Sequence, residues 1–202
     1  MCSRLAVLPA TYRIFVALSS QASADPHNPR SFAFMTIVNK VAQSGLVTLK
    51  LEDYAPKEPI ASFDIADHLF KGLLLREKDF RAVVAEHDWG QYAGQYLAVH
   101  CSADAIIPVW AYMLVAISAE PHALGVYEGE PSAVESRILL ENLAMLDAET
   151  LRDARVVVKG CADRPIPEAA FLEVARKLQP VVRSLMYGEP CSTVPLYKRK
   201  NT

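Results

Sequence analysis

The sequence lacks the features that mark several common classes of protein. It carries no glycine-rich dinucleotide-binding fingerprint and no P-loop, and none of its apolar runs is long enough to cross a membrane. The formal net charge of its 202 residues is only −2, and 51% of them are hydrophobic. We therefore expect neither nucleic acid nor a membrane as a partner, and a globular domain with a sizeable core instead of a disordered chain.

Cysteine is also scarce. The four cysteines stand at positions 2, 101, 161 and 191, too few for a disulfide scaffold and too dispersed for a local metal-binding motif. Free thiols are the simpler expectation, and they suit the reducing environment of the cytoplasm. The sequence thus predicts a cytoplasmic protein.

The N-terminal stretch, residues 1–34, has two interpretations. It loosely resembles a secretory signal, but Pro9 and Arg13 interrupt its apolar part. Met35 directly precedes the first good helical pattern. We therefore expect residues 1–34 to be a poorly ordered extension and residues 35–202 to form a single α/β domain, with a cleaved signal peptide as the alternative.

Two stretches of the chain have the same construction, residues 97–108 (LAVHCSADAIIP) and residues 155–167 (RVVVKGCADRPIP). In each, an apolar strand ends at a turn that contains cysteine and aspartate, and a helical pattern follows. A continuous apolar run such as Val156–Val158 is typical of a parallel strand covered on both faces, with a right-handed crossover to the next strand. These patterns predict an α/β fold, a mixed sheet with a parallel core flanked by helices.

The N-terminal part of this fold is expected to be an antiparallel hairpin. Residues 47–53 alternate between apolar and polar side chains, residues 55–59 contain two prolines that indicate a turn, and residues 60–65 return as a second strand. Helical patterns are expected at residues 77–86, 108–119, 132–145 and 167–187. The second is so apolar that we expect it to be buried on most sides, and Pro180 should kink or split the last.

The carboxyl ends of the two look-alike strands predict where a ligand would bind. In open α/β sheets, ligands bind beyond the carboxyl ends of the strands. Cys101, Asp104, Cys161 and Asp163 all fall at this edge. With Cys191 as a third thiol, Cys101 and Cys161 would bind zinc or an iron–sulfur species, because soft metals prefer thiolate ligands. The two aspartates would bind the ligand or orient the turns.

Each of these residues also has a purely structural interpretation. Free cysteines are commonly small core residues, and an aspartate after a strand commonly caps the next helix. Cys191 reaches the same edge only if Pro180 reverses the chain or a second subunit supplies it, and otherwise it is a turn residue. A thiol enzyme acting on a small anion is a further alternative. It requires a general base, and His100 is a poor one for Cys101, because neighbours on a strand point to opposite faces.

The C-terminal segment Gly188–Lys200 supports an alternative function. It contains turn-forming residues up to Pro195 and ends in three consecutive basic residues, which is unlike a disordered tail. In this alternative the protein is a non-enzymatic interaction module that docks a protein partner through the segment, and the thiols only pack. Assembly into a homo-oligomer is compatible with either function.

Five stretches carry a resemblance to a known family: IVNKVAQSGL, KDFRAVVAEHDW, CSADAIIPVWAYMLVA, VVVKGC and, the most distinctive, SLMYGEPCSTVPLYKRK. Over residues 37–200 the chain resembles a bacterial family known as domain of unknown function 2480. The resemblance implies a cytoplasmic protein, a domain that starts near Met35 and an association with iron–sulfur assembly genes, which suits a thiol-bearing site. It implies no established activity, so no catalytic role follows from it.

Overall fold

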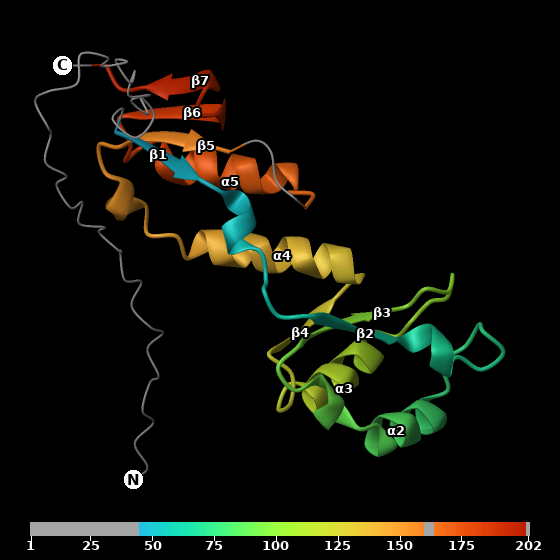
Figure 1. The fold of residues 1–202 in the computed structure, drawn as a ribbon. Coiled ribbons are helices and arrows are strands. Elements are labelled where there is room, and N and C mark those ends of the chain that lie inside the picture. The colour runs from blue at the N-terminus through green and yellow to red at the C-terminus, as the bar shows by residue number, and fades with distance from the viewer. Residues whose placement is uncertain (1–44, 160–163, 201–202) are drawn as a thin grey trace, which may run out of the picture. The chain divides into compact units, whose positions relative to one another are not determined.

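The computed structural model describes residues 45–159 and 164–200, all within one compact unit that spans residues 39–202 (Figure 1). The described strands are β1 (Leu46–Leu49), β2 (Ile60–Asp64), β3 (Tyr96–His100), β4 (Gly125–Glu128), β5 (Arg155–Val158), β6 (Ser184–Glu189) and β7 (Ser192–Lys198). The described α-helices are α2 (Glu77–Glu86), α3 (Val109–Ala119), α4 (Pro131–Ala144) and α5 (Glu168–Leu178). Short 3₁₀ helices are η1 (Leu51–Tyr54), η2 (Ile65–His68), η3 (Trp89–Tyr92) and η4 (Ala148–Leu151).

The fold is α/β, as the sequence predicts. Within the described residues, no helix is both long and apolar enough to span a membrane. The expected N-terminal extension, residues 1–34, lies outside the described part of the chain, so the division at Met35 stays a prediction.

The first sheet contains four strands in the order β1-β5-β6-β7. β1, β5 and β6 run parallel, and β7 is antiparallel to β6, so this sheet has the predicted mixed character and parallel core. Figure 1 shows α5 lying along one face of β5 and β6. The strand residues Val156, Val158 and Leu185 share a buried core with Val174 and Leu178 of α5.

The second sheet contains β2, β3 and β4, all parallel, in the order β2-β3-β4. One face packs against α2 and α3, where Phe63 and Val99 share a core with Phe80 and Val115. The other face packs against α4, because Ala98 of β3 lies in a cluster with α4 residues Val134 and Ile138. Since α4 also contributes Leu139 and Leu143 to the core of the first sheet, this one helix is shared by both cores.

The expected N-terminal hairpin is wrong. β1 pairs with β5, and β2 pairs with β3, both in parallel, so the two strands belong to different sheets. Between them, the buried Leu51 opens η1, and the Asn142 side chain of α4 donates a hydrogen bond to the Tyr54 carbonyl at 2.9 Å. The segment that connects β1 to β2 is therefore held by a helix distant in the sequence. The alternation of residues 47–53 does not predict this contact.

The C-terminal helix is shorter than expected. α5 ends at Leu178, and β6 begins at Ser184. Pro180 stands between them and cannot continue a helix, because it lacks an N–H group and clashes with the preceding turn. Residues 184–187, expected to be helical, form a strand parallel to β5. The proline therefore splits the pattern and reverses the chain.

α3 is more exposed than its apolar composition predicts. Its fully buried side consists of one residue per turn, Ala111, Val115 and Ala119. Three large apolar residues on the helix are more than half exposed: Val109 (74%), Met113 (59%) and Ile117 (72%). The expectation that this helix is buried on most sides is wrong, because α2 and the second sheet cover one side of it only.

Candidate functional site

The two look-alike strands are β3 and β5, and they lie in different sheets. The expectation that one sheet edge carries Cys101 together with Cys161 is therefore wrong. Cys101 follows β3, is partly buried, and its thiol lies 3.5 Å from the Ala103 carbonyl oxygen. Cys161 and Asp163 lie outside the described residues, so their part in a site stays a prediction.

Cys191 lies at the exposed tip of the β6–β7 hairpin. Because the chain reverses at Pro180, this tip follows the carboxyl end of β6, the strand next to β5. Among the described residues, no three Cys, His, Asp or Glu side chains are placed to hold one metal ion. Asp104 is exposed and is not the cap of α3, whose N-cap position is Pro108.

The turn after β3 is held by a residue that the sequence did not single out, Asp64 at the end of β2. Its Oδ1 accepts hydrogen bonds from the backbone N–H of Ala66 at 2.9 Å and of Ser102 at 3.0 Å. Burial alone would raise the pKa of Asp64, but the hydrogen bonds from Ser102 and Ala66 and the nearby His100 together lower the pKa below its usual value of 3.8. Asp64 therefore remains ionised and ties the end of β2 to the end of β3.

The same edge carries a serine, a histidine and a glutamate in a row. Ser62 of β2 places its Oγ 2.7 Å from His100 Nε2, and Glu130 Oε1 lies 3.0 Å from His100 Nδ1. The histidine side chain is only 12% exposed, whereas that of Glu130 is 59% exposed. The Nδ1–Glu130 contact has the distance of an ion pair but not the alignment of a hydrogen bond. We refer to these three residues as the Ser–His–Glu row.

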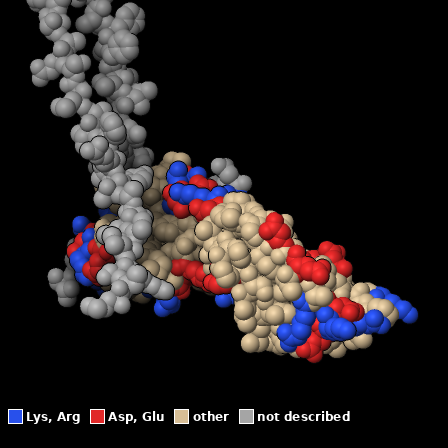
Figure 2. All heavy atoms as spheres, turned by 90° about the horizontal axis from the view of Figure 1, so that it is seen from below, with Lys and Arg blue, Asp and Glu red and all other residues tan. Residues whose placement is uncertain are grey.

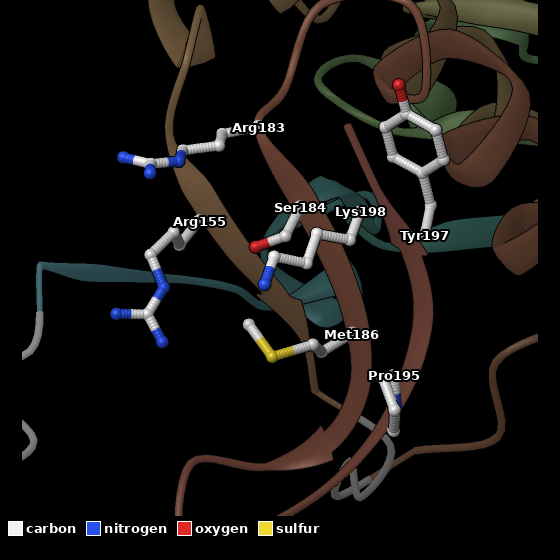
Figure 3. A pocket seen from close by; sticks show the side chains of 7 residues that line it. All are labelled: Arg155, Arg183, Ser184, Met186, Pro195, Tyr197 and Lys198. Atoms are coloured by element: carbon white, nitrogen blue, oxygen red, sulfur yellow. The ribbon is translucent and has the colours of Figure 1, made fainter. Parts of the chain in front are cut away.

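A second candidate site lies on the first sheet, in a groove of about 340 Å³. Figure 3 shows the side chains that line it, with Lys198 between Ser184 and Met186. The lining residues, which define the basic groove, are Arg155, Arg183, Ser184, Met186, Pro195, Tyr197 and Lys198. Three of these are cationic, and among these seven described residues none is acidic.

The strand register explains why the basic side chains gather there. Arg155 of β5 is paired with Ser184 of β6, which is paired with Lys198 of β7. Directly paired residues point to the same face of a sheet, so these three share one face. A β-bulge lies between the pairs of Leu185 and Met186 with β7, and it turns Pro195 toward this face as well. Pro195 is tolerated because β7 is the edge strand among the described residues.

A family model with the description "Protein of unknown function (DUF2480)" matches residues 35–199. The chain belongs to the DUF2480 family. No match was found among the curated proteins or the solved structures that were compared. The matched part of this DUF2480 chain runs from before β1 to the end of β7, so both the Ser–His–Glu row and the basic groove lie within the family domain.

Sequence reasoning on this DUF2480 chain missed the Ser–His–Glu row for a physical reason. Ser62 and His100 are 38 residues apart, and they meet because β2 and β3 pair in parallel. The expected hairpin gave β2 a different neighbour and hid this contact. The available signal was a serine and a histidine, each in a short apolar strand pattern, but periodicity alone does not say which strands are neighbours.

Proposed function

We propose that this DUF2480 protein is a cytoplasmic interaction module that binds an acidic, extended segment of a protein partner along β7. The observation that carries the proposal is the basic groove, which combines three cationic side chains with β7, the edge strand of its sheet among the described residues. An extended peptide can add a strand to such an edge, and its side chains are then selected by the adjacent groove.

The charge of the groove favours an acidic partner. On the face shown in Figure 2, Lys and Arg alternate with Asp and Glu, so one sign of charge does not dominate there. The groove differs, since Arg183 and Lys198 line it together with Arg155, and among the described residues that line it none carries a carboxylate. Complementary charge of this kind steers association and selects partners.

The hairpin that forms one wall of the groove is anchored at its end. Arg199, directly after β7, forms an ion pair with Asp153 and donates a hydrogen bond to the Val181 carbonyl at 2.7 Å. This contact ties the end of β7 to the segment between α5 and β6. Beyond the groove, Val194 and Leu196 of β7 are 58% and 57% exposed and offer apolar contacts to an added strand. A surface that is already ordered loses less entropy when it binds.

The test uses a fluorescent peptide of alternating glutamate and valine. We expect the full chain to bind it with an affinity that falls as salt is added, and Arg183→Glu with Lys198→Glu to weaken binding at least about tenfold, which corresponds to about 1.4 kcal/mol. The matched control is Lys57→Glu with Lys78→Glu, which changes the net charge equally but lies outside the groove. Equal loss in both double variants, or binding of a lysine–valine peptide with the same affinity, would reject the proposal.

A thiol site that handles zinc or an iron–sulfur species is the second candidate. Its support is the parallel pairing of β5 and β6, since the chain continues from one into Cys161 and from the other into Cys191. Cys101 belongs to the second sheet and would not take part. We expect anaerobic Zn²⁺ binding to be lost in Cys191→Ser and kept in Cys101→Ser. Equal binding by both variants would contradict a site that uses Cys191.

A further inference from the structure

The Ser–His–Glu row has the arrangement of a nucleophile, a base and an orienting carboxylate. We propose that Ser62, His100 and Glu130 form a catalytic site that hydrolyses small carboxylic esters. The proposal is independent of the basic groove, which lies on the other sheet.

The distances fit the roles. A serine hydroxyl becomes a nucleophile when an adjacent base within about 2.6–3.2 Å accepts its proton, and a third group holds that base in place. Here Ser62 Oγ lies 2.7 Å from His100 Nε2, and Glu130 lies 3.0 Å from the other ring nitrogen. Ser62 is exposed, so a substrate can reach its hydroxyl, whereas the imidazole is 12% exposed and therefore restrained.

Glu130 is positioned by α4. It occupies the N-cap position of the helix, yet its side chain makes no capping hydrogen bond, and the carboxylate lies beside His100 instead. The contact is not yet aligned, but catalytic hydrogen bonds are often long or poorly aligned without substrate and tighten in the complex. In the proposed role Glu130 is a positioning residue, because it acts through His100.

A hollow lies close to the row, although Ser62, His100 and Glu130 do not line it. Its volume is about 380 Å³, which is the size of a small-molecule site, and its lining includes Ile60, Pro131 and Ser132. Ile60 lies two residues before Ser62 and therefore on the same face of β2, and Pro131 directly follows Glu130. The lining also contains the ion pair of Arg164 with Glu135, 2.6 Å apart. In the proposal, the polar substituents of a short ester bound at Ser62 extend toward this hollow.

The reaction is balanced within the row and needs only water besides the ester. Ser62 Oγ attacks the ester carbonyl while its proton passes to His100 Nε2. The bond from the carbonyl carbon to the alkoxy oxygen then breaks, and the alcohol leaves with that proton. Water, deprotonated by the same nitrogen, attacks the acyl-serine, which releases the carboxylic acid and restores the hydroxyl.

The test is covalent labelling of the full chain with a fluorophosphonate, followed by intact-mass and peptide-mass measurement. The Ser62 oxygen forms a bond to phosphorus, fluoride leaves, and the serine proton passes to His100. We expect one added phosphonate on Ser62, and a labelling rate at least about 100-fold lower in His100→Gln, the usual size of a general-base contribution. Glu130→Gln should lower the rate by a smaller factor.

Ser136→Ala is the matched control. Ser136 is partly exposed on α4, and its hydroxyl donates to the Ser132 carbonyl instead of to a base. We expect this variant to be labelled like the unchanged protein, and Ser62→Ala, checked for folding by circular dichroism, to remain unlabelled. Absence of labelling in the unchanged protein, or labelling that persists in Ser62→Ala, would overturn the proposal.

Discussion

Asp64 connects two strands through one carboxylate oxygen. It lies at the end of β2, yet one of its two backbone partners is Ser102, which follows β3. The residue therefore stabilises the edge on which the Ser–His–Glu row is built. Burial alone would raise the pKa of Asp64, but a hydrogen bond from the Ser102 side chain, the two N–H hydrogen bonds and the nearby His100 stabilise the charged carboxylate, which is why the pKa falls.

The effect of Asp64 on stability should depend on pH. The pKa of Asp64 lies below 3.8 in the folded protein and near 3.8 in the unfolded chain, so its contribution is fully present above pH 3.8 and is lost as pH falls through the lowered pKa. We expect Asp64→Ala to reduce the free energy of unfolding at pH 7 by about 0.5–2 kcal/mol, the usual cost of removing such a capping side chain. The difference from the unchanged protein should shrink below pH 3.8.

Urea unfolding at a series of pH values measures this difference. Asp104→Ala is the control, because Asp104 is exposed and lies on the turn after β3, which Asp64 contacts at Ser102. Its effect should stay within about 0.5 kcal/mol, as is usual for surface substitutions. A pH-independent cost of Asp64→Ala would mean that the side chain acts through packing and not through its charge.

Local chemistry alone did not distinguish Asp64 from Asp104. Both stand near the end of an apolar strand, and both are suited to capping. Asp64 takes the role because β2 and β3 are neighbours, which brings the Ser102 N–H within 3.0 Å. The sequence thus predicts the kind of contact at this edge, whereas strand pairing decides which residue makes it.

At the scale of elements, the sequence predicts a strand or a helix well where the residues that end the element are themselves recognisable. The strand over Val156–Val158 and the helix over residues 77–86 are observed close to their expected bounds. Over residues 167–187 the pattern wrongly predicts one helix, because the apolar residues of α5 and of the following strand β6 together keep a helical spacing. Pro180 was the physical signal for the change, and the sequence could not say whether it bends the helix or ends it.

The β6–β7 hairpin depends on Gly188. Its φ is +120°, a conformation that residues with a side chain rarely adopt, and an added Cβ would lie 2.5 Å from the Ser192 carbonyl oxygen. Gly188→Ala would therefore destabilise the folded protein through both the backbone strain and the clash. We expect the free energy of unfolding to fall by about 2 kcal/mol or more, since backbone strain alone costs about 1–3 kcal/mol.

Gly94→Ala is the matched comparison for Gly188→Ala. Gly94 also has a positive φ, +74°, but its added Cβ would meet nothing within 4 Å. Only the conformational cost of about 1–2 kcal/mol should remain. Chemical unfolding of the two variants separates the clash from the strain. Equal effects would show that the hairpin relaxes enough to accept a side chain at position 188.

At the scale of the molecule, the alternation of strands and helices predicts the α/β class but not the number of sheets. The apolar runs of β3 and β5 are equally compatible with one sheet or with two. What separates them is α4, whose Val134 and Ile138 contact one core and whose Leu139 and Leu143 contact the other. A helix with apolar residues on two sides is the sequence signal for this sharing, but the sequence alone does not say which strands each side contacts.

The exposed side of α3 is the strongest indication of self-association. Val109, Met113 and Ile117 stand one turn apart, and the helix Val109–Ala119 contains no charged residue. Exposed apolar patches of this kind mark interaction sites. A second copy related by a two-fold axis would cover the patch with an identical one and would bury no charged side chain of the helix. We therefore expect the full chain to sediment as a dimer in analytical ultracentrifugation, and Met113→Glu with Ile117→Glu to convert it to a monomer.

The comparison variant for the α3 patch is Leu172→Glu with Met145→Glu. Leu172 and Met145 are 72% and 84% exposed, so the control adds the same two charges at apolar surface positions outside α3. It should leave the dimer intact, because isolated exposed apolar residues are normal on a monomer surface. If the unchanged protein sediments as a monomer at every concentration, the prediction of self-association through α3 is wrong. The result would not bear on binding of the acidic peptide, since the basic groove lies on the other sheet.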